Sequence, residues 1–106
     1  SQSTAQALQS MMENGVSSPE GAASGARIDG ARVGGKTGTA ENGLDENGDA
    51  LPFTLWFTGY AYMGDKQVAV AVVIEDAGGE AYGFAGTSSD LPVRVGKQIM
   101  EAVLNQ

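Results

Sequence analysis

The chain has 106 residues, which is enough for one domain with one modest hydrophobic core. Its 13 acidic residues outnumber its 6 basic residues and give a net charge of −7, which argues against a surface that binds nucleic acid or an anionic membrane. Cysteine and histidine are both absent, which excludes disulfides, thiolate or imidazole metal sites and a histidine-based catalytic triad within the chain.

The first predicted element is a helix over residues 3–14. Ser3 and Gln6 have the spacing of a capping box, and Gly15 is suited to end the helix. Four apolar side chains share one face and are expected to pack on a sheet rather than to bind a ligand: Ala5, Leu8, Met11 and Met12. The Ser-Pro-Glu sequence at 18–20 then predicts a second, short helix.

Three strands are predicted next. Residues 32–40 form the first, and its glycines permit the close approach of another backbone or of a ligand. Residues 53–63 form an aromatic-rich second strand, and a tight turn at 64–66 leads to the third strand at 67–75. The third strand is a nearly continuous apolar run, which predicts a central strand that is buried on both faces.

Small side chains on one face of that third strand, Ala69 and Ala71, leave room for a helix to lie close. The last segment supplies a helix, capped by Ser89 or Asp90, whose apolar residues repeat every four positions: Leu91, Val95, Ile99 and Val103. The order helix, strand, strand, strand, helix predicts an α+β fold: an antiparallel sheet of about three strands with the N- and C-terminal helices packed on it.

Residues 41–52 are acidic and rich in turn formers, and we expect an exposed loop. Asp45, Asn47 and Asp49 alternate as in a calcium-binding EF-hand loop. However, Ala50 stands where that loop needs its glycine, and Trp56 stands where it needs its bidentate glutamate. A solvated hairpin loop is therefore the better prediction.

Two chemistries match the glycine-rich stretch around Lys36. Residues 30–37 fit the phosphate-binding pattern G-x-x-x-x-G-K-[ST], whereas Lys36-Thr37-Gly38 is the K-T-G element of penicillin-recognising serine acyltransferases. A phosphate loop must run from an apolar strand into a helix, but residues 21–30 are mostly Gly, Ala and Ser. A helix after Lys36 would also contain Gly38 and soon meet Asn42-Gly43, so the sequence favours a strand.

Three segments together carry a wider resemblance: V-G-G-K-T-G-T-A-E at 33–41, W-F-T-G-Y-A at 56–61 and the apolar run at 68–74. The chain resembles the C-terminal part of a penicillin-binding protein transpeptidase domain, most closely the monofunctional type of cell division or elongation. The resemblance covers essentially the whole chain and implies a fragment of the β-lactamase/transpeptidase-like fold. One departure is the G-T-S-S-D sequence at 86–90, where an Ala- and Pro-rich approach to the last helix is expected.

The resemblance implies roles for four residues in cleaving a terminal D-Ala-D-Ala unit. Lys36 would set the positive field of the cleft and assist proton movement. Thr37 and Thr39 would offer hydroxyl groups to the carboxylate of the substrate or of a β-lactam, and the Thr39 N–H would form half of an oxyanion hole. Gly38 would keep the strand edge clear for the substrate. No metal or cofactor is expected.

The family's serine nucleophile lies in an S-x-x-K motif, and no such motif occurs here. Val33, Met63 and Arg94 stand three residues before the three lysines. Ser88-Ser89-Asp90 follows K-T-G, so it is expected to cap a helix rather than to act as the family's S-x-N motif. We therefore expect residues 1–106 to be the C-terminal portion of the catalytic domain and to be inactive alone.

The expected partners are a peptidoglycan stem peptide, β-lactams and the upstream part of the transpeptidase domain. Nucleic acid is not expected, and contact with a membrane only through an upstream anchor. The resemblance places the protein on the cell-wall side of the bacterial cytoplasmic membrane. A β-lactamase, a D,D-carboxypeptidase or a β-lactam sensor of the same fold stays open, as do a nucleotide binder and a noncatalytic interaction module.

The resembled sheet has five strands, and its third C-terminal strand pairs with an N-terminal strand. Here the apolar run at 68–74 would then be an unpaired edge, which invites pairing with another chain. We expect this edge to be covered by a second copy, by an upstream chain, or by residues 1–31 folding back.

Overall fold

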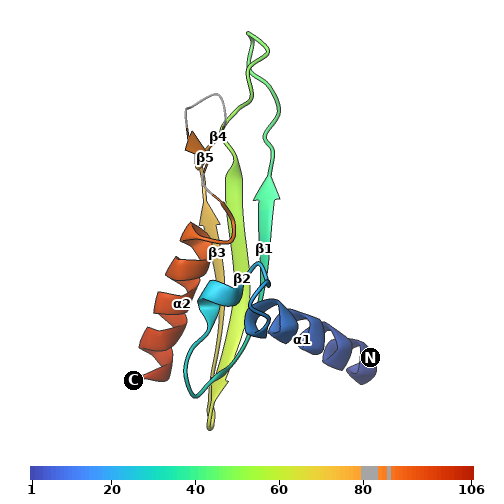
Figure 1. Ribbon diagram of the computed structural model, residues 1–106, viewed down its shortest axis with the longest axis vertical. Helices are drawn as coiled ribbons and strands as arrows, with labels where there is room; N and C mark the ends of the chain where they lie inside the picture. The colour runs from blue at the N-terminus through green and yellow to red at the C-terminus, as the bar shows by residue number, and fades with distance from the viewer. Residues whose placement is uncertain (80–83, 86) are drawn as a thin grey trace.

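Three antiparallel strands form the centre of the fold, in the order β1 (Arg32–Ala40), β2 (Thr54–Met63) and β3 (Lys66–Ile74). The computed structural model describes residues 1–79, 84–85 and 87–106. Its remaining elements are α1 (Gln2–Ser17), the short 3₁₀ helix η1 (Ser24–Ala26), the two-residue strands β4 (Gly78–Gly79) and β5 (Phe84–Ala85), and α2 (Leu91–Leu104). Figure 1 shows α2 along the β3 side of the sheet and α1 projecting from the β1 side. The predicted α+β class is confirmed.

The core lies on one face of the sheet, beneath α2 and η1. Phe57 of β2 is fully buried at its centre, and glycines bring the neighbouring backbones against its ring. A Cβ added at Gly96 of α2 would lie 2.4 Å from Phe57 Cδ1, and one added at Gly35 of β1 would lie 2.6 Å from Phe57 Cε2. The helix and the strands can therefore approach this closely only because these positions carry no side chain.

The prediction that the third strand is central and buried is wrong. β3 is an edge strand that pairs only with β2 among the described residues, and Val73 is 49% exposed. The helix lies over the valine face, where Val72 is buried, whereas Ala69 and Ala71 are exposed on the open face. An apolar run predicts that both faces of a strand can be buried, but the described part of this chain covers only one face of β3.

The first helix is longer than predicted, and its apolar face is open. Ser1 is the N-cap and its hydroxyl accepts the N–H of Thr4 at 3.3 Å, so the predicted capping box at Ser3 is wrong. The helix also continues past Gly15. Packing of its apolar face on a sheet is wrong as well, since Leu8 is 53% and Met11 63% exposed. The helix meets the sheet through its C-terminal half, where Val16 is buried.

The expected second helix is reduced to the single turn η1. Pro19 and Glu20 lie in a turn, and Gly21 then presses against the end of α1. A Cβ added at Gly21 would lie 2.1 Å from the Gly15 carbonyl oxygen, so the chain reverses too tightly here for a longer helix to form.

The last helix was predicted correctly, but its buried face was not. Leu91 is 41% and Ile99 44% exposed. The residues that face the core are Pro92, Val93, Gly96, Met100 and Leu104. A search for apolar repeats passes over Gly96, although that glycine sets how closely the helix approaches the sheet. Asp90 occupies the N-cap position, yet its carboxylate accepts a 2.7 Å bond from Arg94 instead of capping the helix.

Basic side chains from outside the two helices bind the carbonyl groups at the C-terminal ends of α1 and α2. Neither helix has a basic residue in its last turn. Arg27 donates to the carbonyls of Val16 and Ser17 at 3.0 and 3.2 Å, and Lys66 donates to those of Leu104, at 3.0 Å, and Gln106. A cation at a helix C-terminus satisfies orphan carbonyls and complements the helix dipole.

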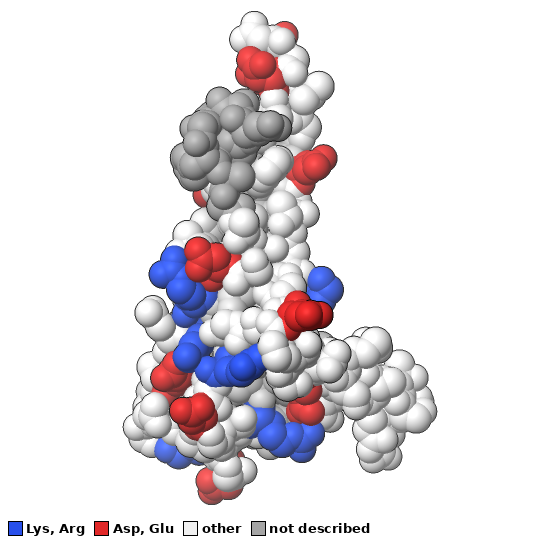
Figure 2. Space-filling model, viewed as in Figure 1, with Lys and Arg blue, Asp and Glu red and all other residues white. Residues whose placement is uncertain are grey.

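Between β1 and β2 the chain projects as a long arm, with an isolated bridge between Leu44 and Ala50. One Asp45 carboxylate oxygen accepts the N–H groups of Asn47 and Asp49 at 2.8 and 2.9 Å, so this carboxylate shapes the turn. Figure 2 shows acidic side chains at the tip of the arm and most basic side chains over the lower half of the molecule. Within the described part of the chain, neither helix is long and apolar enough to cross a membrane.

Candidate active site

Lys36 lies in the middle of β1, directly opposite Thr58 of β2. The strand continues in regular antiparallel register from Arg32 to Ala40, so no helix begins at Lys36. A phosphate loop needs such a helix, whose N-terminus supplies much of the anion binding. The nucleotide-binding hypothesis is therefore wrong, and the K-T-G interpretation of these residues remains.

Alternate residues of β1 direct their backbone N–H and C=O groups toward the outer edge of the strand, away from β2. A Cβ added at Gly59 would lie 3.1 Å from the Gly34 carbonyl oxygen, which therefore points toward β2. A Cβ added at Gly15 of α1 would lie 3.3 Å from the Gly35 carbonyl oxygen, which therefore points away from β2. In an antiparallel ladder the N–H and C=O of one residue point to the same side, and the side alternates along the strand. The backbone N–H and C=O groups of Thr37 and Thr39 thus face the outer edge, like those of Gly35.

The side chains around this edge differ in exposure. Lys36 is exposed, and its ammonium donates to the Thr37 carbonyl oxygen at 2.6 Å, which uses one of its three N–H donors. Thr37 is 9% exposed and lies on the helix-covered face opposite Phe57. Thr39 lies on the same face as Thr37 but is exposed.

Gly38 stands apart from the other glycines of the strand. Added Cβ atoms at Gly34 and Gly35 would collide with the rings of Tyr60 and Phe57, so packing requires glycine at both positions. An added Cβ at Gly38 would meet only the Cβ of Trp56 at 3.7 Å, an ordinary contact, and its φ is not positive. Neither packing nor backbone conformation therefore explains why Gly38 lacks a side chain.

A groove of about 610 Å³ runs beside the motif, between α1 and β1. Its helix wall is apolar, and Lys36 is the one charged residue among the described residues that line it. The groove is lined by Leu8, Met11, Met12, Gly15, Ala22 and Ala23 on one side and by Gly35, Lys36, Thr37 and Thr58 on the other. Sequence reasoning assigned the methionines to the core. Thr58 was not among the predicted site residues. Antiparallel pairing of the two motif strands, which places Thr58 opposite Lys36, was the one sequence feature that could have indicated it.

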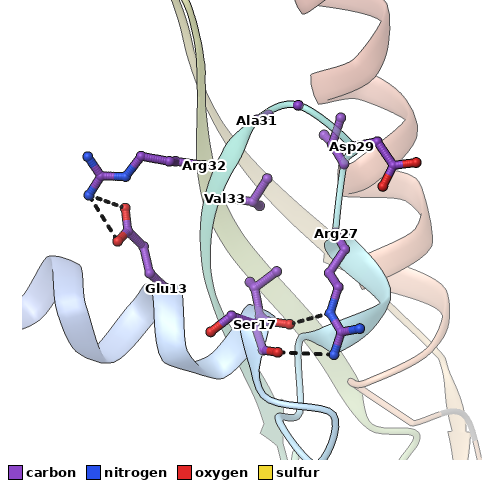
Figure 3. Close-up of a pocket in the computed structure, with 10 residues that line it drawn as sticks. Glu13, Ser17, Arg27, Asp29, Ala31, Arg32 and Val33 are labelled. Atoms are coloured by element: carbon purple, nitrogen blue, oxygen red, sulfur yellow. Dashed lines mark hydrogen bonds and ion pairs between the residues drawn. The ribbon is translucent and has the colours of Figure 1, made fainter.

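A second cavity, of about 520 Å³, lies at the start of β1 and holds none of the predicted site residues (Figure 3). Both of its arginines are engaged with the protein itself: Arg32 with Glu13, and Arg27 with the end of α1. Within residues 1–79, 84–85 and 87–106, no three acidic side chains gather closely enough to hold a metal ion. The groove beside Lys36 is therefore the better candidate site.

Comparisons with known proteins agree on one family. The family described as the penicillin-binding protein transpeptidase domain matches residues 1–101. Peptidoglycan D,D-transpeptidase PbpA of Mycolicibacterium smegmatis is 34% identical over 79 residues, which are 74% of this chain and 15% of that protein.

Two solved structures share the fold at 28% identity. One is a protein of Atopobium parvulum described as a peptidoglycan glycosyltransferase, with a TM-score of 0.72 over all of this chain and 24% of that one. The other is the TP domain of penicillin-binding protein 3 from Burkholderia pseudomallei, with a TM-score of 0.64 over 99% of this chain and 29% of that one. The chain thus spans less than a third of each relative.

Proposed function

The chain belongs to the penicillin-binding protein transpeptidase domain family, and from this we propose that residues 1–106 form the C-terminal portion of a peptidoglycan D,D-transpeptidase. The parent enzyme would be of the monofunctional cell-division or elongation type, acting on the cell-wall side of the cytoplasmic membrane. It would cross-link stem peptides through an acyl-enzyme, and β-lactams would acylate the same serine.

In this proposal the outer edge of β1 binds the substrate. The backbone of an extended stem peptide would pair with the outward amides, and the Thr39 N–H would stabilise the oxyanion as negative charge develops on the attacked carbonyl. Lys36 would supply positive field and assist proton transfer, while the hydroxyls of Thr37 and Thr39 would bind the carboxylate. Gly38 is the observation that supports this proposal most directly, because packing does not account for its missing side chain, whereas a ligand lying beside this strand would.

The nucleophile would come from the upstream part of the domain. No serine of residues 1–106 lies in an S-x-x-K motif, so this segment would contribute the substrate edge but not the attacking oxygen. The exposed apolar side chains of α1 and the open face of the sheet support a partner there, since large apolar groups such as Leu8, Met11 and Trp56 gain by burial.

The test is acylation of the complete protein by a fluorescent penicillin. Replacing Lys36 by Ala should slow acylation by roughly two to four powers of ten, on the usual magnitudes of acid–base and electrostatic catalysis. Lys97→Ala is the matched control, because it removes the same charge from α2, where Lys97 pairs with Glu101 at 3.7 Å. Equal acylation rates in both variants would refute the role of Lys36.

A further inference from the structure

Two polar contacts link α1 to the sheet, and both involve residues 9–13 of the helix. Tyr60 of β2 bonds to Gln9, and Arg32 of β1 pairs with Glu13. We propose that Tyr60 and the Arg32–Glu13 pair are positioning residues for Lys36: they fix the angle of α1 and so the shape of the groove beside the motif strand. This inference rests on the proposed function of Lys36. It adds residues that act through α1 and do not touch the substrate.

Tyr60 reaches α1 by lying across β1. Tyr60 stands directly opposite Gly34 of β1 in the strand register. A Cβ added at Gly34 would lie 2.4 Å from the Tyr60 Cζ atom and 2.5 Å from its hydroxyl oxygen. The missing side chain at Gly34 thus gives the ring its path over the strand. Beyond the strand, the Tyr60 hydroxyl donates to the Gln9 carbonyl oxygen at 3.2 Å. Tyr62 packs edge-on against the ring, with centroids 5.5 Å apart.

Arg32 holds the next part of the same helical turn. Its Nη2 atom lies 3.0 and 3.1 Å from the two carboxylate oxygens of Glu13. The Arg32 side chain is 67% exposed, so solvent screens the pair and its contribution to global stability is small. The pair joins the start of β1 to the turn of α1 that carries Glu13, so it adds a second link beside the one from Tyr60.

The environment keeps the Tyr60 phenol in its donating form. Burial raises the pKa of Tyr60, and the nearby Glu13 carboxylate raises it further. A tyrosine with an ordinary pKa already keeps its proton at neutral pH, and the raised pKa of Tyr60 extends this donating form to more alkaline pH.

The position of α1 matters because the helix forms one wall of the groove. Met12 lines the groove in the same turn that Tyr60 and Arg32 hold, and Lys36 and Thr37 form the facing wall. A helix that pivoted about Gly15 would move Met12 relative to Lys36 without unfolding either element. Displacements of about 1 Å at a reacting centre can cost about a hundredfold in rate.

The test uses the complete transpeptidase domain and measures the first-order rate constant and the noncovalent affinity of penicillin acylation separately. Tyr60→Phe should lower the rate constant roughly tenfold, as expected for a modest misplacement, and leave the thermal midpoint nearly unchanged. Tyr62→Phe is the matched control: it removes the same group from the same face of β2, and its hydroxyl makes no hydrogen bond among the described residues. This control should acylate like the wild type.

A double-mutant cycle shows whether Tyr60 acts through Lys36. In a Lys36→Ala background, Tyr60→Phe should have almost no further effect, because α1 would then be held against a strand that lacks its lysine. Full multiplication of the two effects, or a folded Tyr60→Phe domain with the wild-type rate, would overturn the inference. Glu13→Gln provides a second variant at the surface of α1 that leaves the sheet intact, and it should slow acylation in the same way. If Lys36→Ala itself has no effect, the proposed function fails instead.

Discussion

The glycines of the motif strand fall into two groups that only coordinates separate. Gly34 and Gly35 are required by the rings of Tyr60 and Phe57, whereas Gly38 faces no such obstacle. In the sequence these three positions look alike, because a glycine in a strand indicates a close approach without saying what approaches. The structure thus explains two of them by packing and shows no packing role for the third.

Gly38→Ala separates stability from activity at this position. We expect the complete domain to keep its thermal midpoint, since the new methyl group meets only an ordinary contact at 3.7 Å. Acylation by penicillin should fall at least about tenfold, because the methyl group would stand on the open face of β1, between the outward amides of Thr37 and Thr39 with which the substrate would pair. Gly25→Ala in η1, where the nearest atom is 3.4 Å away, is the control and should change neither property. A large loss of stability in Gly38→Ala would mean that packing explains the glycine after all.

At the scale of elements, the strands were predicted well and the helix faces were not. β1 has the predicted bounds, and β2 and β3 differ from prediction by one residue at each shifted end. Turn residues and apolar runs mark strands locally. Which side of a helix is buried depends on where the helix docks, and docking here follows glycine contacts and long-range polar contacts such as Tyr60 to Gln9. Neither leaves a periodic pattern in the sequence.

The contact between α2 and the sheet depends on Gly96. Replacing Gly96 by Ala would place a methyl group 2.4 Å from the Phe57 ring, so the helix must move away or the ring must leave its rotamer. Overpacking of this kind costs about 1–3 kcal/mol, which chemical denaturation of the complete domain would detect. Phe57→Leu in the same chain should recover part of the loss by making room. A Gly96→Ala domain as stable as the wild type would contradict this packing.

The edge of β3 gives a residue-by-residue prediction for hydrogen exchange. Phe53 exchanges backbone bonds with Ala77 and Gly78, which places odd-numbered residues of β2 toward β3. Their partners Val70 and Val72 then bond to β2, whereas the amides of Ala69 and Ala71 point outward. We expect the outward amides to exchange fast in the isolated chain and slowly in the complete domain. Equal protection of both pairs in an isolated monomer would contradict the exposed edge.

One expected cover for that edge is wrong. Residues 1–31 do not fold back over β3, because α1 contacts β1 at the opposite side of the sheet. A second copy or an upstream chain remains as the predicted cover.

At the scale of the whole molecule, one face of the sheet is covered by helices and the other is open among the described residues. The covered face holds Phe57 beneath α2 and η1. The open side carries Lys36, the groove beside α1, the exposed Trp56 and the outer edge of β3. The relatives are longer than this chain, which covers 15–29% of their lengths. We propose that this segment presents the substrate edge while the attacking serine lies in the rest of the domain.

Mass mapping of the penicillin adduct tests that claim most directly. The complete domain and the isolated segment 1–106 are incubated with penicillin, digested and searched for a peptide that carries the added mass. We expect one adduct in the complete domain, on a serine outside residues 1–106, and none on the isolated segment. An adduct on any serine within residues 1–106, or a folded complete domain that takes up no penicillin, would contradict it.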